Sequence, residues 1–365
     1  MRSIVRTLLL AALVAAGVFA VGVAPAQAAV NVGPGDSIQA AINAAAPGTV
    51  INVAPGTYRE TLLIRKDGIK LRGAGDSDDA NGTILAPPAN GSNLCGDGPG
   101  VFPGICVLAK RLDRNFNVVT PVQNVEVSGF LVHFFPSDGI VSYGASHVLF
   151  QNDTAARNGG YGITSFVSNG NVFNQLVSRN NQAPGFYIGD SPDASFLLKN
   201  SLSVGNQFGI LVREANNGTL TDNVFQNNCA GIFVLNHGND PAVDVRVQNW
   251  EIEGNQINNN NKVCEDDSGG PPFGGVGIAL LGPKNVVVEN NNIDGNKKVA
   301  GSDAGGGVVL VNSLSDGGNN PVGNTIRNNT FGDNKPYDIW YDGTGSGNTF
   351  PGNSCDSSNP AYICS

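Results

Sequence analysis

The sequence is poor in charge and in the residues that favour helices. Only 14% of its 365 residues are charged, methionine occurs once, and acidic residues outnumber basic ones to give a net charge of −9. So few cations cannot neutralise a phosphate backbone, which excludes general nucleic-acid binding. At 41% hydrophobic residues the chain is not disordered. Its 49 glycines and its abundant asparagines instead favour an all-β protein rich in turns.

Long apolar runs are also scarce, and the one present lies at the amino end. Arg2 and Arg6 precede an apolar run over residues 8–23, and the small residues of Ala26–Ala28 follow it. The run is shorter than the roughly 20 residues that span a bilayer. The pattern predicts a secretory signal peptide over residues 1–28. Residues 29–365 are then expected to form one secreted, extracellular domain without a membrane span.

Histidine is rare, and the cysteines do not have metal-site spacing. No C-x-x-C pattern occurs, and His133, His147 and His237 are scattered, so a zinc site is excluded and His133 and His147 are expected to be structural. An even number of cysteines in an exported chain predicts disulfides. The six cysteines fall into local pairs, which predicts the bonds Cys95–Cys106, Cys229–Cys264 and Cys355–Cys364.

An internal repeat is the most informative feature. A glycine followed by a large apolar residue recurs from Gly139 to Gly307, at intervals of 23, 23, 24, 22, 46 and 30 residues, and we interpret the interval of 46 as two periods. The period is too short for a propeller blade and lacks the leucine spacing of a leucine-rich repeat. Three short strands with three turns fill it. The repeat therefore predicts a single-stranded right-handed parallel β-helix with three strands per coil, the coils about 4.8 Å apart.

In such a fold, equivalent residues stack on one another, so we expect Asn152, Asn174, Asn200 and Asn223 to form an internal ladder of side-chain amides. The amphipathic segment 36–48 predicts a helix that caps the amino end. Residues 90–117 and 262–275 are expected to be loop excursions, and residues 335–365 a carboxyl-terminal cap.

The segments Ala54–Tyr58 (APGTY) and Leu71–Gly75 (LRGAG) resemble the first coil of secreted bacterial β-helix proteins of the pectate-lyase-like superfamily. The resemblance implies this fold over the exported chain and an extracellular polysaccharide as partner. The superfamily's catalytic signatures are missing as sets. Asp266-Asp267 lies in a cysteine-bounded loop, His237-Gly238 lacks the preceding glycine of a polygalacturonase, and the epimerase Asp-Pro-His-Asp is absent. No catalytic residue can therefore be transferred.

The repeat also places residues in space. The second and fourth residues after each glycine should face outward and form an apolar stripe. Its members are Val141, Tyr143, Thr164, Phe166, Tyr187, Leu211, Arg213, Phe233 and Leu235. Either long loops fold over this stripe, or it is a cleft in which aromatic rings stack on sugars. The two interpretations are compatible.

Beside the stripe, a polar cluster is the candidate catalytic site: Asp190, Arg213, Glu214 and His237. The expected substrate-binding residues are Tyr143, Phe166, Tyr187, Phe233, Asn236 and Asp240. Stacked carboxyl groups raise each other's pKa. Neighbouring coils would give the carboxyl spacing of a retaining glycosidase, and Asp190 with Asp240 that of an inverting one. In a lyase or epimerase, Arg213 would neutralise a uronate while His237 takes a proton. The alternative is a solvated ladder of ion pairs.

Three classes of function stay open. A secreted enzyme that acts on polysaccharide, as a lyase, epimerase or glycoside hydrolase, is preferred to a non-catalytic glycan-binding protein. A metal-trafficking accessory protein is disfavoured by the shortage of His and Met. The acidic segments 76–79 and 264–267 are possible Ca²⁺ ligands, although solvated loops are the simpler interpretation. A monomer is expected.

Overall fold

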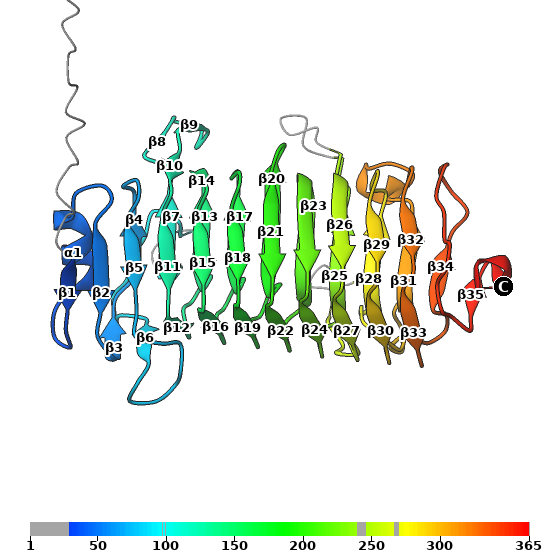
Figure 1. Ribbon diagram of the computed structural model, residues 1–365, viewed down its shortest axis with the longest axis horizontal. Helices are drawn as coiled ribbons and strands as arrows, with labels where there is room; N and C mark the ends of the chain where they lie inside the picture. The colour runs from blue at the N-terminus through cyan, green and yellow to red at the C-terminus, as the bar shows by residue number, and fades with distance from the viewer. Residues whose placement is uncertain (1–28, 97, 99, 239–245, 266–269, 365) are drawn as a thin grey trace, which may run out of the picture.

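Each coil of the chain contributes up to three short strands, and strands of successive coils pair in parallel, so that three long sheets form an elongated stack (Figure 1). The computed structural model describes residues 29–96, 98, 100–238, 246–265 and 270–364. The predicted signal peptide, residues 1–28, lies outside the described residues. The predicted fold class, a parallel β-helix with a short helix at its amino end, is confirmed.

Sheet A comprises β1 (Val30–Val32), β2 (Val50–Val53), β5 (Lys70–Arg72), β11 (Glu126–Ser128), β15 (Leu149–Gln151), β18 (Val172–Asn174), β21 (Phe196–Lys199), the end of β23 (Phe208–Thr221), β26 (Gln248–Glu253), β29 (Val287–Glu289) and β32 (Thr325–Arg327). Sheet B comprises β3 (Gly56–Arg59), β6 (Thr83–Ala86), β12 (Phe130–His133), β16 (Thr154–Ala156), β19 (Val177–Arg179), β22 (Leu202–Val204), β24 (Val224–Gln226), β27 (Gln256–Asn258), β30 (Asn292–Asp294) and β33 (Thr330–Gly332).

Sheet C comprises β4 (Leu62–Ile64), β7 (Ile105–Leu108), β13 (Ile140–Tyr143), β17 (Ile163–Phe166), β20 (Phe186–Ser191), the start of β23, β25 (Ala230–Leu235), β28 (Val276–Leu281), β31 (Gly306–Val311), β34 (Ile339–Tyr341) and β35 (Ser358–Asn359). Outside these sheets lie the antiparallel pair β8 (Arg111–Leu112) and β9 (Val118–Thr120), the parallel pair β10 (Val122–Gln123) and β14 (Ala145–Ser146), the helix α1 (Ile38–Ala44) and the 3-10 helices η1 (Leu314–Asp316) and η2 (Ala361–Cys364).

The register of sheet C shows where the repeat was interpreted correctly and where it was not. Ile210 pairs with Phe186 on one side and Ile232 on the other. Ile210 and Ile232 are fully buried in the core, so the predicted inward phase holds. However, Ile232 pairs directly with Ile278, so the 46 residues form one coil, not two. The additional residues lie in longer connections between β25 and β26 and between β27 and β28.

The asparagine ladder exists, but three of its four predicted members are wrong. Asn152 and Asn200 are exposed and occupy left-handed bends, with φ of 54° and 52°. Asn174 is half-buried on the outer side of β18, whereas Asn223 is buried in a ladder. Asparagine both tolerates left-handed backbone and stacks inside the coil, and the prediction confused these roles. The inner ladders are Asn223, Asn255, Asn291, Asn329 and Asn353, and Asn158, Asn181, Asn206, Asn228, Asn260, Asn296 and Asn334.

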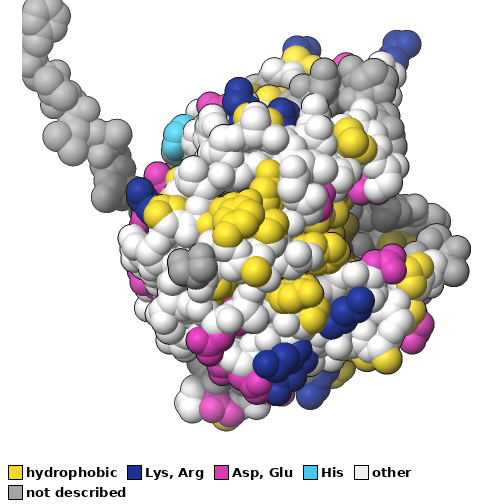
Figure 2. All heavy atoms as spheres, turned by 90° about the vertical axis from the view of Figure 1, so that its right-hand side faces the viewer, with side chains coloured by type: hydrophobic (Ala, Val, Ile, Leu, Met, Phe, Trp, Pro, Cys, Tyr) yellow, Lys and Arg dark blue, Asp and Glu magenta, His cyan; other side chains and the backbone are white. Residues whose placement is uncertain are grey.

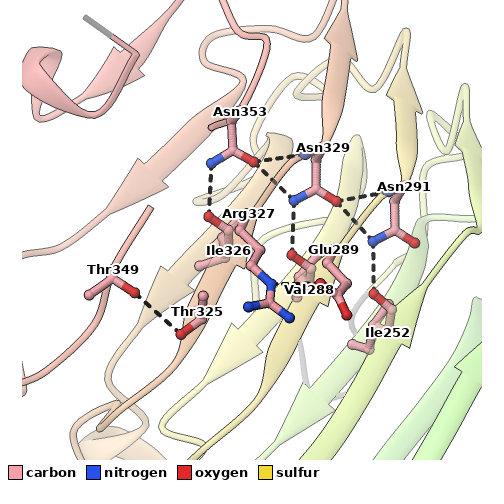
Figure 3. Close-up of polar contacts among 10 residues, drawn as sticks. All are labelled: Ile252, Val288, Glu289, Asn291, Thr325, Ile326, Arg327, Asn329, Thr349 and Asn353. Atoms are coloured by element: carbon pink, nitrogen blue, oxygen red, sulfur yellow. Dashed lines mark hydrogen bonds and ion pairs between the residues drawn. The ribbon is translucent and has the colours of Figure 1, made fainter. Parts of the chain in front are cut away.

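Figure 3 shows the end of the first ladder. The Nδ2 of Asn291 donates to Oδ1 of Asn329 (2.9 Å) and to the carbonyl of Ile252 (2.8 Å). Its Oδ1 accepts from the backbone N–H and the Nδ2 of Asn255, at 2.9 and 3.0 Å. Each rung thereby satisfies buried backbone groups at turns where the strand ladder cannot.

Both ends of the stack are covered. At the amino end, Ile38 and Ile42 of α1 are buried against the first coils, and the Ser37 side chain accepts a hydrogen bond from the Ala40 N–H as the N-cap. At the carboxyl end, hydrophobic side chains gather near the middle of the face, and charged side chains lie towards its edge (Figure 2). Tyr341 and Phe350 are partly buried there against the core.

Three disulfides join Cys95 to Cys106, Cys229 to Cys264 and Cys355 to Cys364, the pairs that the sequence predicts. The first joins the segment around Cys95 to Cys106 of β7, a strand of sheet C inside residues 90–117, so the prediction of one loop excursion over 90–117 is wrong there. The second joins Cys264 to Cys229, which directly precedes β25.

Candidate functional site

The outer face of sheet C is divided into two parts: a loop covers one part, the other lines a cleft, and sugar binding in that cleft stays a prediction. Over the later coils the stripe is covered by other side chains. The ring of Phe233 stacks on Phe208, with 4.7 Å between ring centroids, and Phe273 of the 262–275 loop lies within 5.8 Å of both. Val309 beside them is only 1% exposed. Phe233, expected to bind substrate, therefore packs under a loop.

Over the earlier coils the stripe lines a cleft of about 560 Å³. Its floor is formed by Val141, Tyr143, Tyr161 and Phe166. The walls come from the 90–117 excursion, with Leu94, Cys95 and Gly96 on one segment and Leu112 and Phe116 on the β8–β9 hairpin, while Ser137, Asp138 and Leu108 complete the lining. Because the excursion forms walls, it leaves Tyr143 and Phe166 in the cleft, where the sequence places them.

Two further residues of this cleft were missed from the sequence. Tyr161 precedes the repeat glycine Gly162, so counting forward from that glycine never reached it. Asp138 precedes Gly139 in the same way, and its carboxylate accepts a hydrogen bond from the Tyr161 N–H (2.8 Å). The position before each repeat glycine was the signal that could have found both.

An aromatic row connects the cleft to the polar cluster. The Tyr187 ring lies 4.7 Å from Phe166 and 4.9 Å from Tyr161, measured between centroids. It is almost fully buried, and the Arg213 guanidinium lies 5.9 Å from its centroid. A Cβ on Gly189 would come within 2.2 Å of the Tyr187 hydroxyl oxygen, so this ring position requires glycine there.

The polar cluster, Asp190, Arg213, Glu214 and His237, is brought together as the repeat predicts. Asp190 and Glu214 follow paired residues of β20 and β23, and both occupy left-handed bends, with φ of 53° and 51°. Arg213 Nη2 lies 3.7 Å from Asp190 Oδ1, and His237 Nδ1 lies 3.5 Å from Glu214 Oε1. The bends at Asp190 and Glu214 lie within β20 and β23, at equivalent positions of neighbouring coils.

Burial distinguishes the members of the cluster. The Glu214 side chain is 3% exposed, whereas Asp190, His237 and Arg213 are 27%, 33% and 38% exposed. Burial raises the pKa of Glu214, and its hydrogen bond with Asp190 raises it further, while Arg213 and His237 act in the opposite direction. Glu214 Oε1 has no hydrogen-bond partner among the described residues. The cluster therefore holds a buried carboxyl group beneath three side chains that reach solvent.

The remaining predicted site residues lie elsewhere. Asn236 is buried, and its Oδ1 accepts a hydrogen bond from the Val247 N–H, so it holds a turn instead of facing the cleft. Asp240 lies outside the described residues, as do Asp266 and Asp267. Within the described ranges, no group of three or more His, Cys, Asp or Glu side chains could hold a metal ion. No helix in the same ranges is long and apolar enough to cross a membrane.

Residues 113–247 match the family described as "Right handed beta helix region". No curated protein matches the chain.

Many solved structures are similar to the chain. The A-module of the mannuronan C-5 epimerase AlgE6 from Azotobacter vinelandii has 20% identity and a TM-score of 0.63, over 87% of this chain and 88% of that one. An alginate lyase from Paenibacillus has 14% identity and a TM-score of 0.53, over 84% and 95%. DFA-IIIase from Arthrobacter chlorophenolicus has 12% identity and a TM-score of 0.56, over 88% and 93%.

At these identities the similarity concerns the fold alone. Together with the parallel register of all three sheets, it establishes that this chain is a right-handed parallel β-helix protein with the pectate-lyase-like fold.

Proposed function

We propose that this protein is an extracellular glycoside hydrolase that binds a polysaccharide along the outer face of sheet C and cleaves it beside the Asp190–Glu214 pair. The observation that carries the proposal is the buried Glu214 carboxyl group, which lies at the position equivalent to Asp190 on the next coil. Its raised pKa lets it keep a proton where an ordinary glutamate has lost it. A glycosidase requires such a proton for the leaving oxygen.

The two carboxyl groups have different roles in this proposal. Asp190 reaches solvent and can contact a glycosidic oxygen, so it is the catalytic residue. Glu214 lies beneath it as a positioning residue. Its proton passes through Asp190 to the leaving oxygen as the glycosidic bond breaks, a water attacks the sugar carbon, and the carboxylate pair takes up the proton that this water releases. Arg213 keeps a positive charge beside Asp190 and over Tyr187. His237 contacts the far side of Glu214.

The cleft supports a neutral glycan. Its aromatic floor suits the C–H faces of sugar rings. Of its ionisable lining residues, Asp138 is acidic and none of those described is Lys, Arg or His. A uronate substrate would have to draw Arg213 away from Asp190. This charge pattern favours hydrolysis over the lyase or epimerase chemistry that the sequence left open.

A second candidate, non-catalytic glycan binding, is favoured by the cleft itself. Tyr143 donates a hydrogen bond from its hydroxyl to the carbonyl of Phe116 (3.1 Å), which holds the hairpin wall over the floor without any help from the polar cluster. A binding function would need only this part of the surface.

Product analysis on a panel of neutral and acidic polysaccharides tests the proposal. New reducing ends support a hydrolase, and ultraviolet absorbance from unsaturated ends would identify a lyase instead. Asp190→Asn should abolish turnover while thermal unfolding shifts by no more than a few degrees, because exposed polar changes usually alter stability by less than about 0.5 kcal/mol. Asp193→Asn, an exposed acid three residues away, is the matched control and should retain activity. Oligosaccharide binding that Tyr161→Ala weakens, without turnover in the parent, would establish the binding function.

A further inference from the structure

Sheet B carries a regular column of positive charge that the site on sheet C does not use. The register aligns Arg59, Ala86, His133, Ala156 and Arg179 at the same position of five successive coils. All five lie at the ends of their strands. The two arginines at this position, Arg59 and Arg179, therefore lie four coils and about 19 Å apart along the helix axis, with His133 midway between them.

Two further residues lie next to this column, one position after its members in the sequence. Phe134 and Arg157 follow His133 and Ala156 at left-handed bends, with φ of 61° and 56°. Phe134 is 51% exposed, and the Arg157 guanidinium lies 5.6 Å from its ring centroid. We name Arg59, Arg157 and Arg179 the cation column.

The arginines of the cation column are unpaired. No carboxylate of the described residues lies within 4.0 Å of Arg59, Arg157 or Arg179, and their guanidinium groups donate no hydrogen bond there. Partial burial lowers the pKa of His133 most; Asp78 opposes this, and the charges of these three arginines lower it further. The arginines therefore act together on one small area, and Asp78 is the acid at its edge.

Sheet A shows that the same geometry pairs charges elsewhere in this chain. Arg72 contacts Glu126 on the neighbouring coil (2.8 Å), and Arg327 contacts Glu289 in the same way (2.6 Å). In a chain of net charge −9 acids are plentiful, yet the three coils between Arg59 and Arg179 carry alanine, histidine and alanine at this position, and no acid. The column is thus left open to a ligand from solution.

We propose that the cation column binds a linear acidic polysaccharide, carboxylated or sulfated, laid along the helix axis on sheet B. Planar guanidinium groups bind such anions through paired hydrogen bonds. Arg59 and Arg179, about 19 Å apart, suit a polymer that presents acidic groups at wide intervals along several coils, and not a duplex nucleic acid with a phosphate every 3.4 Å per strand. The ring of Phe134 is occupied by Arg157, so it offers no open platform for stacking bases.

Binding of polygalacturonate, heparin, dextran and single-stranded DNA to the full secreted chain tests this inference, measured by calorimetry at several salt concentrations. We expect polygalacturonate or heparin to bind, the stronger of the two identifying carboxylate or sulfate as the preferred group, and dextran not to bind at this surface. The triple variant Arg59→Gln, Arg157→Gln, Arg179→Gln should lose about tenfold or more in affinity and most of its salt dependence.

The control is the double variant Arg72→Gln, Arg327→Gln, which removes the paired arginines of sheet A and should change the affinity by less than about twofold. Circular dichroism and thermal unfolding show that both variants fold. Undiminished binding in the triple variant, an equal loss in the control, no binding of either acidic polymer, or tighter binding of DNA would each overturn the proposal. Turnover at sheet C is not a readout here, so failure of the proposed hydrolase leaves this test unaffected.

Discussion

Removing one rung of an inner asparagine ladder should destabilise the protein far more than removing an asparagine from its outer surface. Asn291 takes part in four hydrogen bonds through its side chain, two as donor and two as acceptor. In Asn291→Ala the Asn255 N–H loses its partner inside the helix, while Asn329 Oδ1 still accepts from the Asn291 N–H (3.0 Å).

The magnitude follows from these contacts. Three lost hydrogen bonds at about 1 kcal/mol each, with one orphaned buried donor at about 1 to 3 kcal/mol, give a loss of about 4 to 6 kcal/mol in the free energy of unfolding. A water molecule bound in the space would bring the loss to the lower end. The matched control is Asn174→Ala, whose side chain is half-buried and donates only to side-chain oxygens of Gln151 and Gln175. It should cost no more than about 0.5 kcal/mol.

Urea denaturation of oxidised protein, followed by circular dichroism, measures both variants. Equal losses for Asn291→Ala and Asn174→Ala would refute the assignment of the inner ladder. A loss below about 1 kcal/mol for Asn291→Ala would show that the ladder contributes little to stability.

Three further predictions concern buried acids and a disulfide. The pKa of Glu214 is raised in the native state, so native Glu214 keeps its proton at a pH where the unfolded chain has released it. The stability of the native state therefore falls as the pH rises from the ordinary pKa of 4.5 through the raised pKa. Across that pH window, and not below it, Glu214→Gln should gain in Tm over the parent. Asp153 is fully buried with Oδ2 unpartnered, and burial raises its pKa well above 3.8, so Asp153→Asn should raise the Tm increasingly with pH; a constant difference in differential scanning fluorimetry would contradict this. The double variant Cys229→Ala, Cys264→Ala should lose about 2 to 4 kcal/mol in urea unfolding, and an unchanged midpoint would mean that the 262–275 loop is held by Phe273 packing alone.

The sequence predicted the parts of the fold that repeat strictly. Glycine before a large apolar residue marks the start of a sheet C strand, because a Cβ there would collide with the next coil: on Gly209 it would lie 2.3 Å from the Gly231 carbonyl oxygen. The glycines therefore allowed the inward orientation of Ile210 and Ile232 to be predicted from the sequence. The length of a coil could not be predicted, because strand pairing determines which residues align between coils and not how many residues the connecting loops contain. The pairing of Ile232 with Ile278 is an example.

The ladder was misassigned although a better signal was present. Buried asparagines recur five residues apart, as Asn223 with Asn228, Asn255 with Asn260 and Asn291 with Asn296. These pairs flank the short strands of sheet B, whereas the bend asparagines Asn152 and Asn200 have no asparagine five residues away. The polar cluster was predictable because its members sit at fixed offsets from the repeat glycines. The covering of Phe233 depended on a loop outside the repeat.

The same β-helix contains a coil of 46 residues and coils of 23 residues, which shows that the loops of a coil tolerate insertions. A turn can take in a new segment without altering the rise of the helix, because the strands on either side still meet the same partners. New surface can therefore be added one coil at a time, and a foreign loop grafted between β27 and β28 should be carried without disturbing the coils beyond it. The paired strands thus keep a fixed rise per coil, and the loops that connect them can carry added segments at regular intervals along the helix axis.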